Sequence, residues 1–64
     1  MKKYDIIIIR VYNTGFMDVE INTEKTIFSK KSELDGWLLF AKSKGLSQQF
    51  FERKKNGDRI YYFS

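Results

Sequence analysis

Residues 4–22 contain two β-favouring segments separated by a short turn, and this pattern constrains the fold more than any other feature of the sequence. The segment Tyr4–Tyr12 is rich in β-favouring residues, and Phe16–Asn22 alternates strictly. Between them, Asn13-Thr14-Gly15 has the composition of a three-residue hairpin loop that places a glycine in the left-handed conformation. The pattern therefore predicts an antiparallel β-hairpin.

Pairing the two segments across this loop tests the register of the hairpin. One face then carries three apolar pairs, which are Val11 with Met17, Ile9 with Val19 and Ile7 with Ile21. The other face carries Arg10 opposite Asp18, which is a pair of opposite charges, and Tyr12 opposite Phe16. A slip of one residue would bury Asp18 and Glu20, so both faces favour the same register.

A single helix is predicted after the first hairpin. Ser32 is a favourable N-cap residue, Asp35 three residues later completes an approximate capping box, and Gly45 suits the position just past the end of a helix. The apolar stripe of this helix consists of Leu34, Trp37, Leu38 and Ala41. Gly36 has no local explanation, and we consider a close approach to a strand.

The segment 46–64 allows two interpretations. Asn56-Gly57 is a strong two-residue hairpin turn, and a hairpin closed by it pairs Phe51 with Tyr62 and Arg53 with Ile60. The alternative is a second helix from Ser47 through Lys55, at roughly the spacing of a helix-turn-helix unit, followed by a strand. The many β-favouring aromatic residues in this segment favour the hairpin.

These elements define an α+β fold with two layers, in which one helix packs on one face of a four- or five-stranded sheet. We expect residues 1–64 to form a single small domain with the order β-hairpin, short edge strand, single α-helix and β-hairpin. The short edge strand is Thr26–Phe28, and Lys30 and Lys31 blunt its end. This element order resembles the β-grasp arrangement, which implies that the two terminal strands lie side by side and parallel in the centre of the sheet.

The composition removes most catalytic and cofactor chemistry. The chain has no cysteine and no histidine, so it offers no thiolate nucleophile, imidazole base or zinc site of the usual ligands. The acidic residues are explained by ion pairs, helix starts and turns, and the four glycines form no phosphate-binding loop. We therefore expect a protein that is not an enzyme and that binds no cofactor or metal.

The sequence also bears on where the protein acts. Met1-Lys2-Lys3 is a charged start, but the apolar run Ile6–Ile9 that follows is too short for the core of a signal peptide, and no segment is long enough to span a membrane. We expect a soluble cytoplasmic protein with no membrane partner. The abundance of lysine, isoleucine, asparagine and phenylalanine, without proline, is associated with phage genes or other mobile elements.

Positive charge gathers in the later part of the chain. The formal net charge is +4, and residues 1–22 contribute none of it. Cations cluster at the predicted second hairpin tip, which resembles in its chemistry the wing of winged DNA-binding proteins, and aromatic residues beside them can stack on bases. The candidate nucleic-acid contacts are Arg53, Lys54, Lys55, Arg59, Lys30, Lys31, Lys42, Lys44 and Tyr61.

A second candidate surface is the sheet face turned away from the helix, which one helix cannot cover. Its predicted apolar members are Tyr4, Ile6, Ile8, Tyr12, Phe16, Tyr61 and Phe63. A contiguous apolar patch on a small protein is typical of an interface, although scattered exposed apolar residues are normal. The sequence thus favours a small binding module for DNA or RNA. The alternative is a protein-binding inhibitor or modulator of a host factor, acting through this face or a sheet edge, and a homodimer is a further hypothesis.

Overall fold

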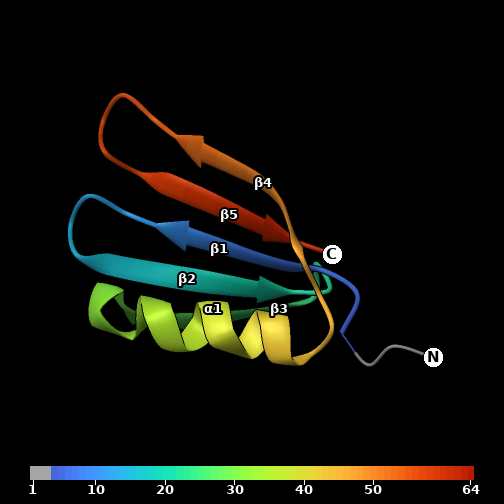
Figure 1. Cartoon of the computed structure of the whole chain (residues 1–64). Helices are drawn as coiled ribbons and strands as arrows, with labels where there is room; N and C mark the ends of the chain where they lie inside the picture. Colours follow the sequence, from blue (N-terminus) through green and yellow to red (C-terminus); the bar gives the residue numbers. More distant parts are fainter. Residues whose placement is uncertain (1–3) are drawn as a thin grey trace.

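The computed structural model describes residues 4–64, so the charged start Met1-Lys2-Lys3 lies outside the described residues. The chain forms one five-stranded antiparallel sheet and one α-helix that lies against the sheet, an α+β fold (Figure 1). The elements in chain order are β1 (Ile7–Val11), β2 (Phe16–Ile21), β3 (Lys25–Lys30), the 3₁₀ turn η1 (Lys31–Glu33), α1 (Leu34–Ser43), β4 (Gln48–Arg53) and β5 (Arg59–Phe63). In the sheet the strands follow the order β3-β2-β1-β5-β4.

The first hairpin has the predicted register. Ile7 pairs with Ile21, and Arg10 with Asp18. The loop is closed by two hydrogen bonds, because Tyr12 N–H donates to the Phe16 carbonyl at 2.9 Å and Gly15 N–H donates to the Tyr12 carbonyl at 3.2 Å. Gly15 has a φ of 94°, the left-handed conformation that the sequence predicts. Three residues of the isoleucine run, Ile7–Ile9, lie in β1, which is the central strand of the sheet.

The core lies between the sheet and α1. Its buried apolar residues are Ile7, Ile9, Val11, Met17, Val19, Leu34, Ala41, Leu46 and Phe63. The alternate residues of β1 that the pattern assigned to the helix side are all among them, since side chains of a strand point to opposite faces in turn. Burying a large apolar side chain stabilises the fold by about 1.5–3 kcal/mol, so this small set accounts for much of the driving force.

The end of α1 agrees with the sequence, whereas its start does not. Gly45, at a φ of 82°, donates its N–H to the Lys42 carbonyl, and Leu46 N–H donates to the Ala41 carbonyl, which is a Schellman motif. The predicted N-cap at Ser32 is wrong. The chain enters the helix through η1, Glu33 occupies the N-cap position, and no side chain caps either turn.

The second hairpin is present, as predicted, but its register differs by one residue. The predicted partners of Phe51 and Arg53 are wrong, because Phe51 pairs with Tyr61 and Arg53 with Arg59. The physical reason is the loop. Lys54 N–H donates to the Asp58 carbonyl at 2.8 Å and Gly57 N–H to the Lys54 carbonyl at 3.1 Å, so three residues form the turn instead of two. This is the same closure as in the first hairpin.

The terminal strands β1 and β5 are neighbours, as the resemblance to the β-grasp arrangement implies, but they run antiparallel. The predicted parallel pairing is wrong because the third strand is a full strand of six residues, Lys25–Lys30. Each of the connections from β1 through β2, β3, α1 and β4 to β5 reverses the chain direction (Figure 1). Because β3 is included, the chain reverses direction an odd number of times between β1 and β5. The two strands therefore run antiparallel.

Three members of the predicted outer apolar patch lie on the helix side instead. Phe63 pairs with Ile7 and is fully buried, and Tyr61 pairs with Ile9 and packs against the core. Paired residues share a face of the sheet, so the register between β1 and β5 moves both side chains inward. Tyr4 also packs against the core, where its ring meets Phe40 edge to face at 5.5 Å between centroids.

Two glycines are expected to respond to alanine in opposite ways. Gly36 lies inside α1 with no atom within 4 Å of an added Cβ, so the suggested close approach to a strand is wrong. Gly36→Ala should stabilise the fold by about 1 kcal/mol. Gly57→Ala should destabilise it by about 1–2 kcal/mol, because Gly57 has a φ of 96°. Chemical denaturation of both variants measures the difference, and destabilisation by Gly36→Ala would contradict the open space beside the helix.

Candidate nucleic-acid interface

The two hairpin loops and the start of α1 lie at one end of the sheet, and the start of β1 and the end of β5 lie at the other end (Figure 1). Two hydrogen bonds join the loops to each other. Asn13 donates from its backbone N–H to Asp58 Oδ1 at 2.8 Å and from its side-chain Nδ2 to the Asn56 carbonyl at 2.7 Å. Lys31 N–H donates to the Gly15 carbonyl at 2.9 Å, which brings the end of β3 to the same place. These contacts assemble separate segments into one end surface.

Six of the predicted nucleic-acid contacts meet at this end, and we call them the basic end: Lys30, Lys31, Arg53, Lys54, Lys55 and Arg59. All of them except Arg59, which is half-buried, are exposed. Both ion pairs found among residues 4–64 belong to Arg10, on another part of the sheet. The cations of the basic end therefore have no carboxylate within 4.0 Å in the described part of the chain.

Arg53 and Arg59 are direct cross-strand partners. The three-residue loop sets this pairing, since a two-residue loop would place Arg53 opposite Ile60. Arg59 pairs with the buried Val11 across β5 and β1, so both arginines lie on the helix side of the sheet. On the same face and next along the strands, Phe51 pairs with Tyr61, and their rings are 5.0 Å apart between centroids.

The two acidic residues of the second hairpin form no ion pair with its cations. Asp58 accepts the Asn13 N–H and a bond from Asn56 Nδ2 at 3.1 Å, so its carboxylate holds the two loops together. Glu52 pairs with Ile60, and alternation places it on the opposite face from its neighbour Arg53. The helix-side face of β4 and β5 thus carries the two arginines and no acidic side chain.

The structure does not bring the remaining predicted contacts to the basic end. Lys42 and Lys44 lie at the C-terminal end of α1, and Lys44 Nζ is over the rings of Tyr4 and Phe40 at 5.4 and 5.2 Å from their centroids. Cations placed over aromatic rings stabilise the helix end. Tyr61 is half-buried and packs against the core, and its partner Phe51, which is not among the residues predicted from the sequence, is the more exposed ring of the two.

The face turned away from α1 is divided by a polar network. Arg10 Nε donates to Asp18 Oδ1 at 2.9 Å, its NH2 group donates to Glu20 Oε1 at 2.8 Å, and the Tyr12 hydroxyl donates to Asp18 Oδ2. Asp18 is only 5% exposed. On one side of this network lie the exposed rings of Phe16 and Phe28. On the other side lie Ile8, Tyr62 and Phe50, with Ile6 half-buried just before β1. The predicted apolar patch is therefore interrupted.

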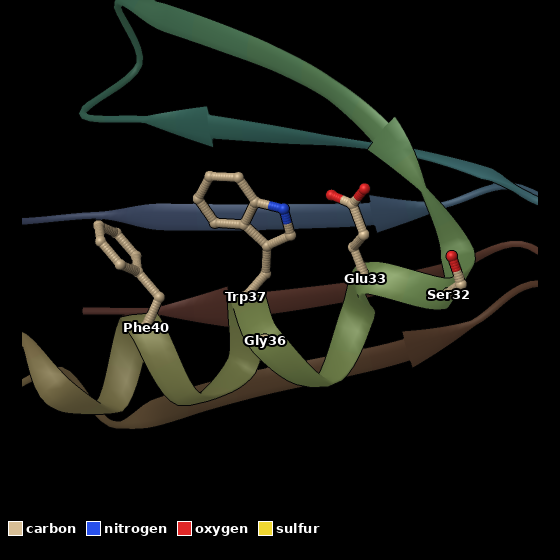
Figure 2. A pocket seen from close by; sticks show the side chains of 5 residues that line it. All are labelled: Ser32, Glu33, Gly36, Trp37 and Phe40. Carbon is tan, nitrogen blue, oxygen red and sulfur yellow. The ribbon is translucent and has the colours of Figure 1, made fainter.

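A shallow hollow of about 510 Å³ lies beside the start of α1, lined by Ser32, Glu33, Gly36, Trp37 and Phe40 (Figure 2). The side chains of Glu33, Trp37 and Phe40 point the same way from the helix, and the Trp37 and Phe40 rings are 5.4 Å apart at their centroids. Glu33 Oε2 accepts a hydrogen bond from the Ser29 hydroxyl at 2.5 Å. The hollow is therefore an aromatic surface whose main polar group already has a partner.

No group of three or more carboxylate, histidine or cysteine side chains that could hold a metal ion occurs within residues 4–64. Within the same residues, no helix is long and apolar enough to cross a membrane. The expectation that the protein is not an enzyme stays a prediction.

A comparison of the chain with models of protein families found no match, and comparisons with curated proteins and with solved structures found no significant similarity.

The Tyr12 phenol is expected to titrate late. Its hydrogen bond to Asp18, then burial, and then the charge of Asp18 raise the pKa of Tyr12 above its usual 10.0. Because the folded pKa is the higher one, this contribution to stability is complete below about pH 10 and is lost as the pH rises through the folded pKa. The difference in phenolate absorbance between wild type and Tyr12→Phe isolates this titration. A midpoint at or below pH 10 would contradict the prediction.

Proposed function

We propose that the protein is a small, cytoplasmic, non-enzymatic module that binds nucleic acid through its basic end. The observation that carries this proposal is the Arg53–Arg59 pair. Like charges directly opposite each other on neighbouring strands destabilise a sheet, and neither arginine has an acidic partner among residues 4–64. A phosphate group between the two guanidinium groups removes this repulsion and accepts paired hydrogen bonds from each.

The distribution of the other cations favours a polymeric anion. Lys30 lies opposite Phe16 on the face away from α1, and Lys31 follows it at the end of β3. Arg53 and Arg59 lie on β4 and β5, on the helix side and across β2 and β1. At about 4.8 Å between strands, β3 and β5 are roughly 14 Å apart, which is too far for one phosphate to bridge. A nucleic-acid strand presents phosphates at repeated intervals, so it can contact both groups.

Charge reversal at the second hairpin loop should abolish binding. Lys54 and Lys55 are exposed and have no ion-pair partner within the described residues, so Lys54→Glu with Lys55→Glu should leave the fold intact. Fluorescence anisotropy of a labelled oligonucleotide measures the dissociation constant. For four phosphate contacts, wild-type affinity should fall on the order of 50- to 150-fold between about 50 and 200 mM salt.

The matched control is the double change Lys25→Glu with Lys42→Glu, at the opposite end of the sheet and helix. Both double variants lower the formal net charge from +4 to 0, because each lysine-to-glutamate change removes two charges. The control should retain most of the affinity. Equal loss in the two variants would mean that bulk charge alone drives binding, and no binding of wild type at low salt would contradict the proposal.

The exposed rings of the outer face support a second candidate function, the binding of a protein partner. Phe28 is 80% exposed and Phe16 is 59% exposed, and Phe28 lies on the edge strand β3. Open edges and exposed aromatic residues are both used in protein interfaces. This candidate requires that Phe16→Ser with Phe28→Ser abolish partner binding or self-association while the Lys54 and Lys55 variant does not.

A further inference from the structure

We infer that the nucleic acid bound by the basic end is single-stranded and that one of its bases stacks on Phe51. This inference rests on the proposed function and names the form of nucleic acid. It comes from a juxtaposition that the hairpin register creates, namely an exposed aromatic ring next to an arginine pair on one face of the sheet.

Phe51 offers an accessible ring surface. It lies on the edge strand β4, where every residue is exposed, and its own exposure is 41%. Tyr61 is partly buried against the core and contacts Phe51 at 5.0 Å between ring centroids. Tyr61 therefore contacts Phe51 from the neighbouring strand, and part of the Phe51 ring stays exposed to solvent.

The arginines supply the phosphate contacts beside that ring. Arg53 follows Phe51 by two residues on β4, so the two side chains lie on the same face about 6.5–7 Å apart along the strand. Arg59 lies opposite Arg53 on β5. A single strand has exposed bases beside its phosphates, so it can place a base on Phe51 and a phosphate at the arginines together. In a duplex the base faces are stacked on one another and cannot reach the ring.

The opposite face of the same strand provides a matched control. Phe50 precedes Phe51 in β4 and is 53% exposed, but it pairs with Tyr62 and lies on the face without the arginines. Glu52 is the charged residue of β4 on that face. Phe50→Ala therefore serves as the control for Phe51→Ala. Both variants lose one exposed aromatic ring, but only Phe51→Ala removes the ring beside the arginines.

The experiment measures the binding of one labelled mixed-sequence DNA oligonucleotide, single-stranded or annealed to its complement, at about 50 mM salt. Wild type should bind the single strand more tightly than the duplex. Phe51→Ala should weaken single-strand binding by about 5- to 150-fold, because stacking of one base contributes that much. Phe51→Tyr should retain the affinity, and Phe50→Ala should change it less than twofold.

Salt dependence distinguishes stacking from charge. Phe51→Ala should leave the slope of log affinity against log salt unchanged, because no phosphate contact is lost. Arg53→Gln should reduce the slope by about 0.7 for a single strand. If Phe51→Ala does not fold, as judged from its thermal unfolding, Phe51→Leu keeps an apolar residue on the strand, removes the aromatic face and serves as the test.

The outcomes separate this inference from the proposed function. Equal affinity for both forms of DNA, or no effect of the Phe51 changes, would overturn the inference and leave nucleic-acid binding in place. An equal loss from Phe50→Ala would also overturn it. If neither form of DNA nor the matching RNA strand binds wild type at low salt, both the inference and the proposed function fail.

Discussion

The glycine at the third position of each hairpin loop decides which side chains lie opposite one another in this sheet. Gly15 and Gly57 both adopt the left-handed conformation, and each donates its N–H back to the residue just before the loop. This closure fixes the register of β1 with β2 and of β4 with β5. The core pairs of the first hairpin and the arginine pair of the second are consequences of the same local geometry.

The first hairpin was predictable from the sequence because two independent features agreed. Its alternation demands one register, and its turn residues fit a loop of the matching length. The second hairpin lacked this agreement. Asn56-Gly57 fits a two-residue turn, and β4 is exposed along its whole length, so no buried face penalised the wrong pairing. The position of Arg59 opposite Arg53, which matters most for the site, was therefore beyond sequence reasoning.

The resemblance to a β-grasp arrangement failed for a related reason. The residue pattern predicts a short strand at Thr26–Phe28. It does not predict how long that strand is, or whether it pairs with β2 along its whole length. Once Lys25–Lys30 forms a complete edge strand, the direction of everything after it is inverted. The facing of Tyr61 and Phe63 depends on the pairing of β5 with β1, which is a contact between distant parts of the chain.

The cations of the basic end were predictable from the sequence. That Lys42 and Lys44 lie far from them was not. That separation depends on the direction in which α1 crosses the sheet, since the helix begins beside the loops and ends beside Tyr4. On the outer face, too, the pairing within one hairpin was predictable and the arrangement of all the strands was not. Arg10, Asp18 and Glu20 were placed correctly by register, yet the way their network divides the aromatic residues follows only from the order of all five strands.

The exposed edge strand β4 has a consequence for motion. It pairs with one neighbour, β5, and none of its residues is buried, so it lacks the apolar contacts that hold β1 and β2 in place. Segments of this kind open locally at a lower free energy than the whole molecule, and their amide hydrogens exchange early. A ligand seated on β4 and β5 would slow that opening in proportion to its affinity. The amide hydrogens of β4 should therefore exchange more slowly when nucleic acid is bound.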